Sequence, residues 1–130
     1  MFSFSQNRQG LRDERFEKIQ TAKIGLITEN LSLTTEQAPQ FWSVYNEYQS
    51  KKFELRKGIK RVLDEANATT TGDDKVISSH RQALAIRKKE IELDEEYMAK
   101  LLKTITPKQY AELKRTEQSF NKKLIEKLRN

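Results

Sequence analysis

Hydrophobic positions recur at intervals of three and four residues along almost the whole chain, which is the spacing of one face of an α-helix. Short polar stretches or helix-start signals divide the chain into four such blocks, which predict helices over about residues 13–29, 34–65, 73–105 and 106–128. No segment shows the two-residue alternation of a half-buried strand, and Gly and Pro are scarce, with four and two copies. The pattern therefore predicts an all-α protein with four helices.

The third predicted helix carries an apolar stripe with a strict seven-residue repeat. Its members are Ile77, Leu84, Ile91 and Met98, and Leu101 and Ile105 extend the stripe. Asp73 or Asp74 is expected to cap the start of this helix, because a short acidic side chain can accept from free backbone N–H groups there.

A short loop joins the two longest predicted helices. Residues 66–72 are small, polar or β-branched and end in Gly72, which is typical of a loop. A short connection between long helices predicts an antiparallel hairpin at the centre of the molecule, flanked by the shorter first and fourth helices. Symmetry about the loop then places Lys52 near Arg87 and Arg56 near Ala83.

A short signature occurs twice, and each copy precedes a predicted helix. Both copies read aliphatic-Thr-x-x-Gln, and their defining residues are Leu33, Thr34 and Gln37 in the first and Ile105, Thr106 and Gln109 in the second. In such a capping box the Thr hydroxyl accepts from the N–H three residues on, and the Gln side chain reaches back to the Thr N–H. The two copies therefore predict helix starts at Thr34 and Thr106, with Pro107 at a favoured first helical position.

The composition favours a thin helical protein over a compact globule. The chain has 130 residues, of which 35% are hydrophobic and 34% charged. We predict a flexible segment over residues 1–12 and one helical domain over residues 13–130. A chain of this kind buries little apolar surface alone, so we expect it to form a homodimer. No stretch is apolar enough to span a membrane, and the first residues lack the pattern of a signal peptide.

The chain has a net charge of +6, and one part of the predicted hairpin is strongly basic: residues 51–61 and 79–89 together carry ten cations and one acid. The cations proposed to form one basic surface are Lys51, Lys52, Arg56, Lys57, Lys60, Arg61, Arg81, Arg87 and Lys88. One interpretation is a surface that attracts an acidic or unfolded polypeptide. The other is an ordinary solvated helix face, although like charges in one region repel and are not what such a face requires.

Residues for catalysis or cofactor binding are not evident. The chain has no cysteine and a single histidine, His80, and it lacks a metal-ligand cluster and a Gly-rich phosphate loop. We therefore predict that the protein is not an enzyme and holds neither a metal nor a cofactor. Sequence-specific nucleic-acid binding is not expected either, because no reading element accompanies the positive charge.

The paired signatures around a long hairpin resemble the LTxxQ-motif (Spy/CpxP-like) family of periplasmic envelope-stress proteins. Residues 27–34 and 41–48 are similar to small members from Bacteroidetes-type bacteria, which are labelled sensors of extracytoplasmic-function (ECF-type) sigma factors. The resemblance extends over about residues 16–128. The chain departs from the family pattern in two respects. The proline of the first copy is Pro39, which comes later than the third position of the motif. The single histidine cannot reproduce the site of metal-sensing relatives.

The resemblance implies a four-helix protomer, an antiparallel homodimer shaped as a thin cradle, and export to the periplasm as a mature chain without its signal peptide. It also implies ATP-independent, chaperone-like binding of non-native or acidic polypeptides during envelope stress. The alternative is an adaptor or sensor subunit that binds one signalling partner, a kinase or an anti-sigma factor, and has no general chaperone activity. A third possibility is a structural or phosphate-gripping helical protein of the cytosol.

Overall fold

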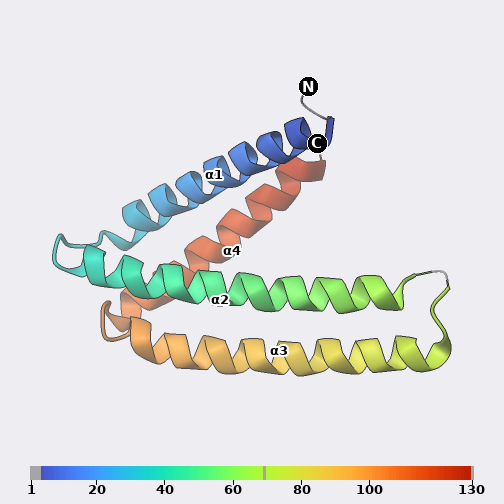
Figure 1. Ribbon diagram of the computed structural model, residues 1–130. Helices are drawn as coiled ribbons and strands as arrows, with labels where there is room; N and C mark the ends of the chain where they lie inside the picture. Colours follow the sequence, from blue (N-terminus) through green and yellow to red (C-terminus); the bar gives the residue numbers. More distant parts are fainter. Residues whose placement is uncertain (1–3, 69, 130) are drawn as a thin grey trace. The chain divides into compact units, whose positions relative to one another are not determined.

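The computed structural model describes residues 4–68 and 70–129, with the side chains of 14–15, 17–68 and 70–129 (Figure 1). Four helices account for most of them: α1 (Phe4–Leu31), α2 (Gln37–Ala66), α3 (Asp73–Leu101) and α4 (Pro107–Arg129). No strand occurs in this described part, which confirms the prediction of an all-α protein with four helices. The chain forms two compact units, the α1–α4 unit (residues 4–35 and 106–129) and the α2–α3 hairpin (residues 36–105).

Helices α1 and α2 begin at other residues than predicted, and α3 ends at Leu101 instead of residue 105. Residues 4–12, which we predicted to be part of a flexible segment, belong to α1, and residues 1–3 lie outside the described residues. Helix α2 begins at Gln37 instead of Thr34, with Glu36 at the N-cap in helical backbone and no side-chain cap. The prediction that Asp73 or Asp74 caps α3 is wrong, because extended Gly72 is the N-cap. Both acids lie in the first turn, where they complement the positive end of the helix dipole.

In the α1–α4 unit, the end of α1 is tied to the start of α4. Ser32 follows α1 with a φ of 49°, the left-handed conformation that commonly ends a helix. The Gln109 amide then donates to the carbonyl oxygen of Leu31 (3.1 Å), which helix ends leave without an internal partner. The residue before Leu31 makes a second tie, in which the Asn30 amide donates to the Thr116 hydroxyl (3.0 Å). Leu113, on the same side of α4, is fully buried.

The α2–α3 hairpin consists of two helices that pack against each other along their length (Figure 1). Near the loop the buried residues of α3 are small, Ser79 and Ala83, which allows the two backbones to approach. At mid-length a Cβ added to Gly58 would stand 3.4 Å from Ile86 Cδ1 of the opposite helix. Farther from the loop, the rings of Tyr48 and Tyr97 stack with centroids 5.2 Å apart. The interface therefore changes from small residues to aromatic ones along the hairpin.

The seven-residue stripe of α3 does not form the contact with α2. Ile77 is 53% exposed, Leu84 61%, Ile91 67% and Met98 44%. The buried residues of α3 are Ser79, Ala83, Tyr97 and Leu101, which lie on a different face of the same helix. Helix α3 thus has two apolar faces, and the one with the strict repeat points to solvent. We call the exposed stripe the apolar column.

Candidate functional site

The register of the hairpin differs from the symmetric one. Lys52 lies beside Asp94 and Glu90 instead of Arg87, and Arg56 faces Glu90 instead of Ala83. Side chains on a helix tilt toward its N-terminus, which lies away from the loop for α2 and at the loop for α3. An α2 side chain therefore meets an α3 residue farther from the loop than symmetry about the loop predicts. This shift places two of the predicted surface cations against acidic residues.

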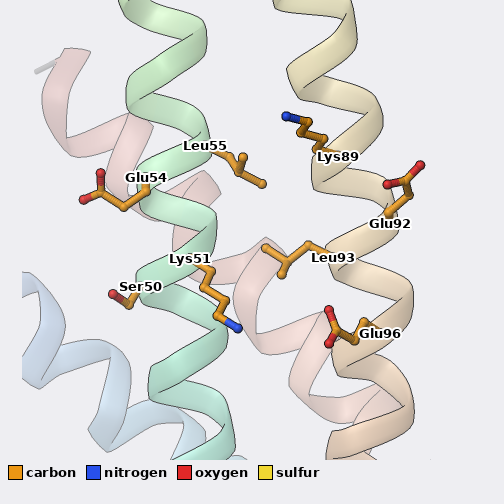
Figure 2. A pocket seen from close by; sticks show the side chains of 8 residues that line it. All are labelled: Ser50, Lys51, Glu54, Leu55, Lys89, Glu92, Leu93 and Glu96. Carbon is orange, nitrogen blue, oxygen red and sulfur yellow. The ribbon is translucent and has the colours of Figure 1, made fainter.

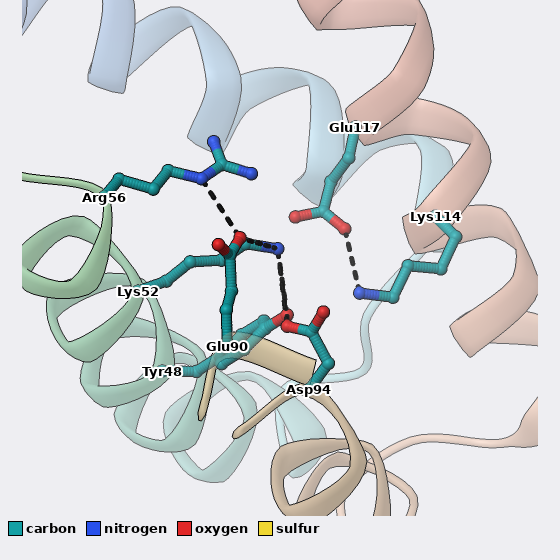
Figure 3. A network of polar contacts seen from close by, with 7 residues as sticks. All are labelled: Tyr48, Lys52, Arg56, Glu90, Asp94, Lys114 and Glu117. Carbon is teal, nitrogen blue, oxygen red and sulfur yellow. Dashed lines mark hydrogen bonds and ion pairs between the residues drawn. The ribbon is translucent and has the colours of Figure 1, made fainter. Parts of the chain in front are cut away.

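These cations belong to a polar network that joins the two helices (Figure 3). The Tyr48 hydroxyl donates to the Asp94 carboxylate. The Lys52 ammonium lies 3.3 Å from the Tyr48 hydroxyl and 3.4 Å from Asp94 Oδ1. The Nε of Arg56 donates to Glu90 Oε1 at 3.2 Å. Because the side chain of Glu90 is only 17% exposed, it needs these cationic partners, and Lys52 and Arg56 have a structural role here.

Three further cations of α2 are paired with acids of their own helix. Lys51 lies 3.3 Å from Glu47, Lys57 lies 3.6 Å from Glu54, and Lys60 lies 2.7 Å from Asp64. Their side chains are all more than half exposed, so solvent screens each pair and its contribution to folding is small. An incoming anionic group would have to compete with an acid already in place at each position.

The carboxyl group of Glu47 has an additional neighbour in α3. The Tyr97 hydroxyl and the Lys51 ammonium both stabilise its charged form and hold the pKa of Glu47 below its ordinary value. Tyr97 and Glu47 in turn raise the pKa of Lys51. Glu47 and Lys51 are therefore both charged at neutral pH and paired with each other.

The remaining cations of the predicted surface are free of such pairs. Among the described residues no ion pair involves Arg61, Arg81, Arg87 or Lys88, and all four are exposed. Lys89 shares these properties, although it was not among the predicted site residues. The structure thus divides the predicted basic surface into a paired set on α2 and an open set that lies mainly on α3.

The members of the apolar column lie among the unpaired cations of α3. Residues three or four positions from a column member are its neighbours on the helix surface. The charged and ionisable neighbours are Asp73, Asp74, His80, Arg81, Arg87, Lys88, Asp94 and Glu95. We call the column with these eight residues the α3 outer face. Its half nearer the loop carries three cations, His80 and two acids, and its other half carries only acids, an arrangement that the count of residue types along the hairpin did not reveal.

Among the shallow grooves on the hairpin, two lie near its middle, between α2 and α3. One has a volume of about 460 Å³, and Figure 2 shows Leu55 and Leu93 between the two helices with charged side chains around them. The other has a volume of about 430 Å³ and is lined in part by Ile59, Arg87 and Ile91. The second groove therefore continues the α3 outer face toward α2 and adds apolar surface next to an unpaired cation.

The second copy of the signature forms the predicted capping box. The Thr106 N–H donates to Gln109 Oε1 (2.9 Å), and the Gln109 N–H donates to the Thr106 hydroxyl (3.1 Å). Ile105 before it is buried, whereas Leu33 in the first copy is half-buried. The second signature is thus a structural element, in which Gln109 both caps α4 and holds the end of α1.

The described residues offer no group of His, Cys, Asp and Glu side chains that could hold a metal ion. His80 is exposed on the α3 outer face. None of the described helices combines the length and apolarity that crossing a membrane requires. The chain matches no protein-family model, no curated protein and no solved structure.

Proposed function

We propose that this protein binds non-native or acidic polypeptides reversibly and without ATP, and that the α3 outer face is the binding surface. The observation that carries the proposal is the combination of an exposed apolar column with cations that have no ion-pair partner in the described chain. The column has four members, each 44% exposed or more, on one side of a single long helix. Soluble proteins rarely leave such a row uncovered without an interaction to serve.

The chemistry of this surface suits weak and broad capture. A side chain that is already half-buried gains roughly 1 kcal/mol when a bound segment covers the rest of it. Contacts of this size along one helix hold an unfolded segment briefly without requiring one sequence. The unpaired Arg81, Arg87 and Lys88 attract acidic segments from a distance, which raises the association rate more than the final affinity. Capture should therefore weaken as salt screens these charges.

The family resemblance supports the biological setting of this proposal. The paired signatures and the hairpin favour an exported stress protein of the periplasm with no catalytic activity. The alternative function is an adaptor that binds one folded signalling partner. Client breadth separates the two, because a chaperone protects unrelated proteins and an adaptor does not.

The test is aggregation of two unrelated destabilised proteins, at low and at moderate salt, with and without this protein and without ATP. We expect protection of both, weakened by salt. The variant R81E/R87E/K88E should lose most of the protection. A variant with the same change in charge on α4, K122E/K123E/K127E, is the control and should retain it. Protection by the α3 variant equal to that of the native chain would refute the assignment of this surface. Protection of neither client would favour the adaptor.

A further inference from the structure

The end of α4 is strongly basic. Residues 121–129, which we call the basic tip of α4, carry four cations and one acid. The cations are Lys122, Lys123, Lys127 and Arg129, and the acid is Glu126. All five side chains are exposed, and none of them forms an ion pair with another described residue. The positive charge of the tip is therefore open to an anionic partner.

The needs of the helix itself account for only part of this charge. Cations in the last turn of a helix complement its dipole, and Lys127 and Arg129 lie in that turn. Lys122 and Lys123 come before the last turn, where the dipole has little effect. Half of the cations of the tip are thus left without a role at the helix end.

Helix α1, which packs against α4, does not neutralise the tip with its described side chains (Figure 1). Because residues 30 and 31 of α1 bond to the first half of α4, the part of α1 before residue 30 runs beside the part of α4 after residue 116. Between residues 14 and 25, the described charged side chains of α1 are two acids and three cations, Glu14, Arg15, Glu17, Lys18 and Lys23. These side chains add no net negative charge.

Exposed apolar side chains lie between the cations of the tip. Ile125 is 53% exposed and Leu128 is 79% exposed. The two are three positions apart and are therefore neighbours on the helix surface. With 3.6 residues per turn, two of the four cations fall on each side of this pair, and Glu126 falls on the opposite side of the helix. The tip thus presents a small apolar patch with cations along both of its edges.

A patch of this kind is typical of helices that lie in the interface of a membrane, where anionic lipids attract the cations. A nucleic acid would pair with the cations alone and leave Ile125 and Leu128 in water. The α3 outer face also combines apolar residues with cations, but four acids accompany them, and an anionic membrane would repel these acids. The tip of α4 is therefore the better match for an anionic lipid surface.

We propose that the basic tip of α4 binds the surface of an anionic lipid membrane. Ile125 and Leu128 enter the boundary between the headgroups and the acyl chains, and the four cations contact the anionic headgroups. Two aliphatic side chains are a small anchor and salt screens exposed cations, so binding needs both contributions. We expect weak, reversible binding that depends on anionic lipid. The site lies in the α1–α4 unit and does not rest on the proposed function of the α3 outer face.

The test is sedimentation of the full chain with large vesicles, made either of phosphatidylcholine alone or of equal parts of phosphatidylcholine and phosphatidylglycerol. The first lipid has no net charge, and the second is anionic. We expect the protein to sediment with the anionic vesicles at low salt, to be released as salt is raised, and to stay in solution with the neutral vesicles. No binding to the anionic vesicles, or equal binding to both kinds, would overturn the proposal.

Two triple variants with the same change in net charge locate the site. K122E/K123E/K127E should weaken binding to the anionic vesicles about a hundredfold, because the attraction of three cations is lost. R81E/R87E/K88E changes the α3 outer face by the same charge and should bind these vesicles like the native chain. Equal weakening by the two variants would mean that net charge alone decides binding, and the assignment to the tip would be wrong.

The variant I125Q/L128Q tests the apolar contribution. It keeps every charge, and its helical content should be unchanged because both side chains are exposed. Binding to the anionic vesicles should weaken roughly tenfold. Binding equal to that of the native chain would overturn the insertion of these side chains. Binding of duplex DNA that this variant leaves unchanged, in a protein that binds no vesicles, would assign the tip to nucleic acid instead.

A fluorescent label tests the orientation of the helix on the membrane. The chain has no cysteine, so one introduced cysteine can carry a polarity-sensitive fluorophore. The label at Leu128→Cys should shift to shorter wavelength when anionic vesicles are added. The label at Ser119→Cys, which is exposed on the opposite side of α4, should not. Absence of the shift at Leu128→Cys in bound protein, or an equal shift at both positions, would contradict the proposed orientation.

Discussion

The replacement of Gln109 by Ala is the sharpest test of what the repeated signature does. The Gln109 side chain accepts from the Thr106 N–H and donates to the Leu31 carbonyl oxygen. Each bond contributes about 1 kcal/mol, so the loss of both should lower the free energy of unfolding by about 2 kcal/mol. For a chain of this length that corresponds to a fall in Tm of roughly 8 °C.

The assay is urea unfolding followed by far-ultraviolet circular dichroism, with extrapolation to water. Gln118→Ala is the matched control, because it makes the same change at an exposed position of the same helix and should be nearly neutral. Gln109→Glu keeps the acceptor for Thr106 but loses the donor to Leu31, so it should cost about half as much as the alanine variant. The reasoning is refuted if Gln109→Ala destabilises the protein no more than Gln118→Ala does.

Four further predictions concern stability. Tyr48→Phe removes the donor to Asp94 and should lower the free energy of unfolding by about 1–2 kcal/mol, measured by the same urea titration; an unchanged value would mean that this bond contributes nothing. Gly25→Ala should stabilise by about 0.5–1 kcal/mol, since its new Cβ meets nothing within 4 Å. Gly58→Ala should stabilise less, because its Cβ would stand against the opposite helix at 3.4 Å, and an equal gain at both sites would contradict this. The pKa of Glu47 is lowered in the folded protein, so the charged carboxylate adds to the free energy of unfolding. This contribution is complete above pH 4.5, which is the ordinary pKa of the group, and is lost as the pH falls through the folded-state pKa. Native protein and Glu47→Gln should therefore differ most above that pH and converge in acid, as checked by unfolding at a series of pH values.

The sequence by itself determined the helices of this protein, because the forces that form them act over a few residues. Periodicity marks an amphipathic helix wherever it occurs, and the Thr106 capping box closes within four positions of the chain. The loop at residues 66–72 and the hairpin were predictable for the same reason. The N-cap of α3 was assigned wrongly, because Gly72 and Asp73 are both common near a helix start and only the backbone distinguishes them.

Only the tertiary structure decided which face of α3 is buried and which cations are free. The faces with Ser79 and with Leu84 both have helical spacing, and the packing against α2 covers the one with small residues. The tilt of the side chains shifted the register, so that Lys52 met Asp94 and left Arg87 open. Hydrophobic periodicity shows that one face of a helix is apolar, and the charge pattern shows which charged residues are close in the sequence. Neither reports which surfaces meet, because that depends on how residues far apart in the chain fit together in space.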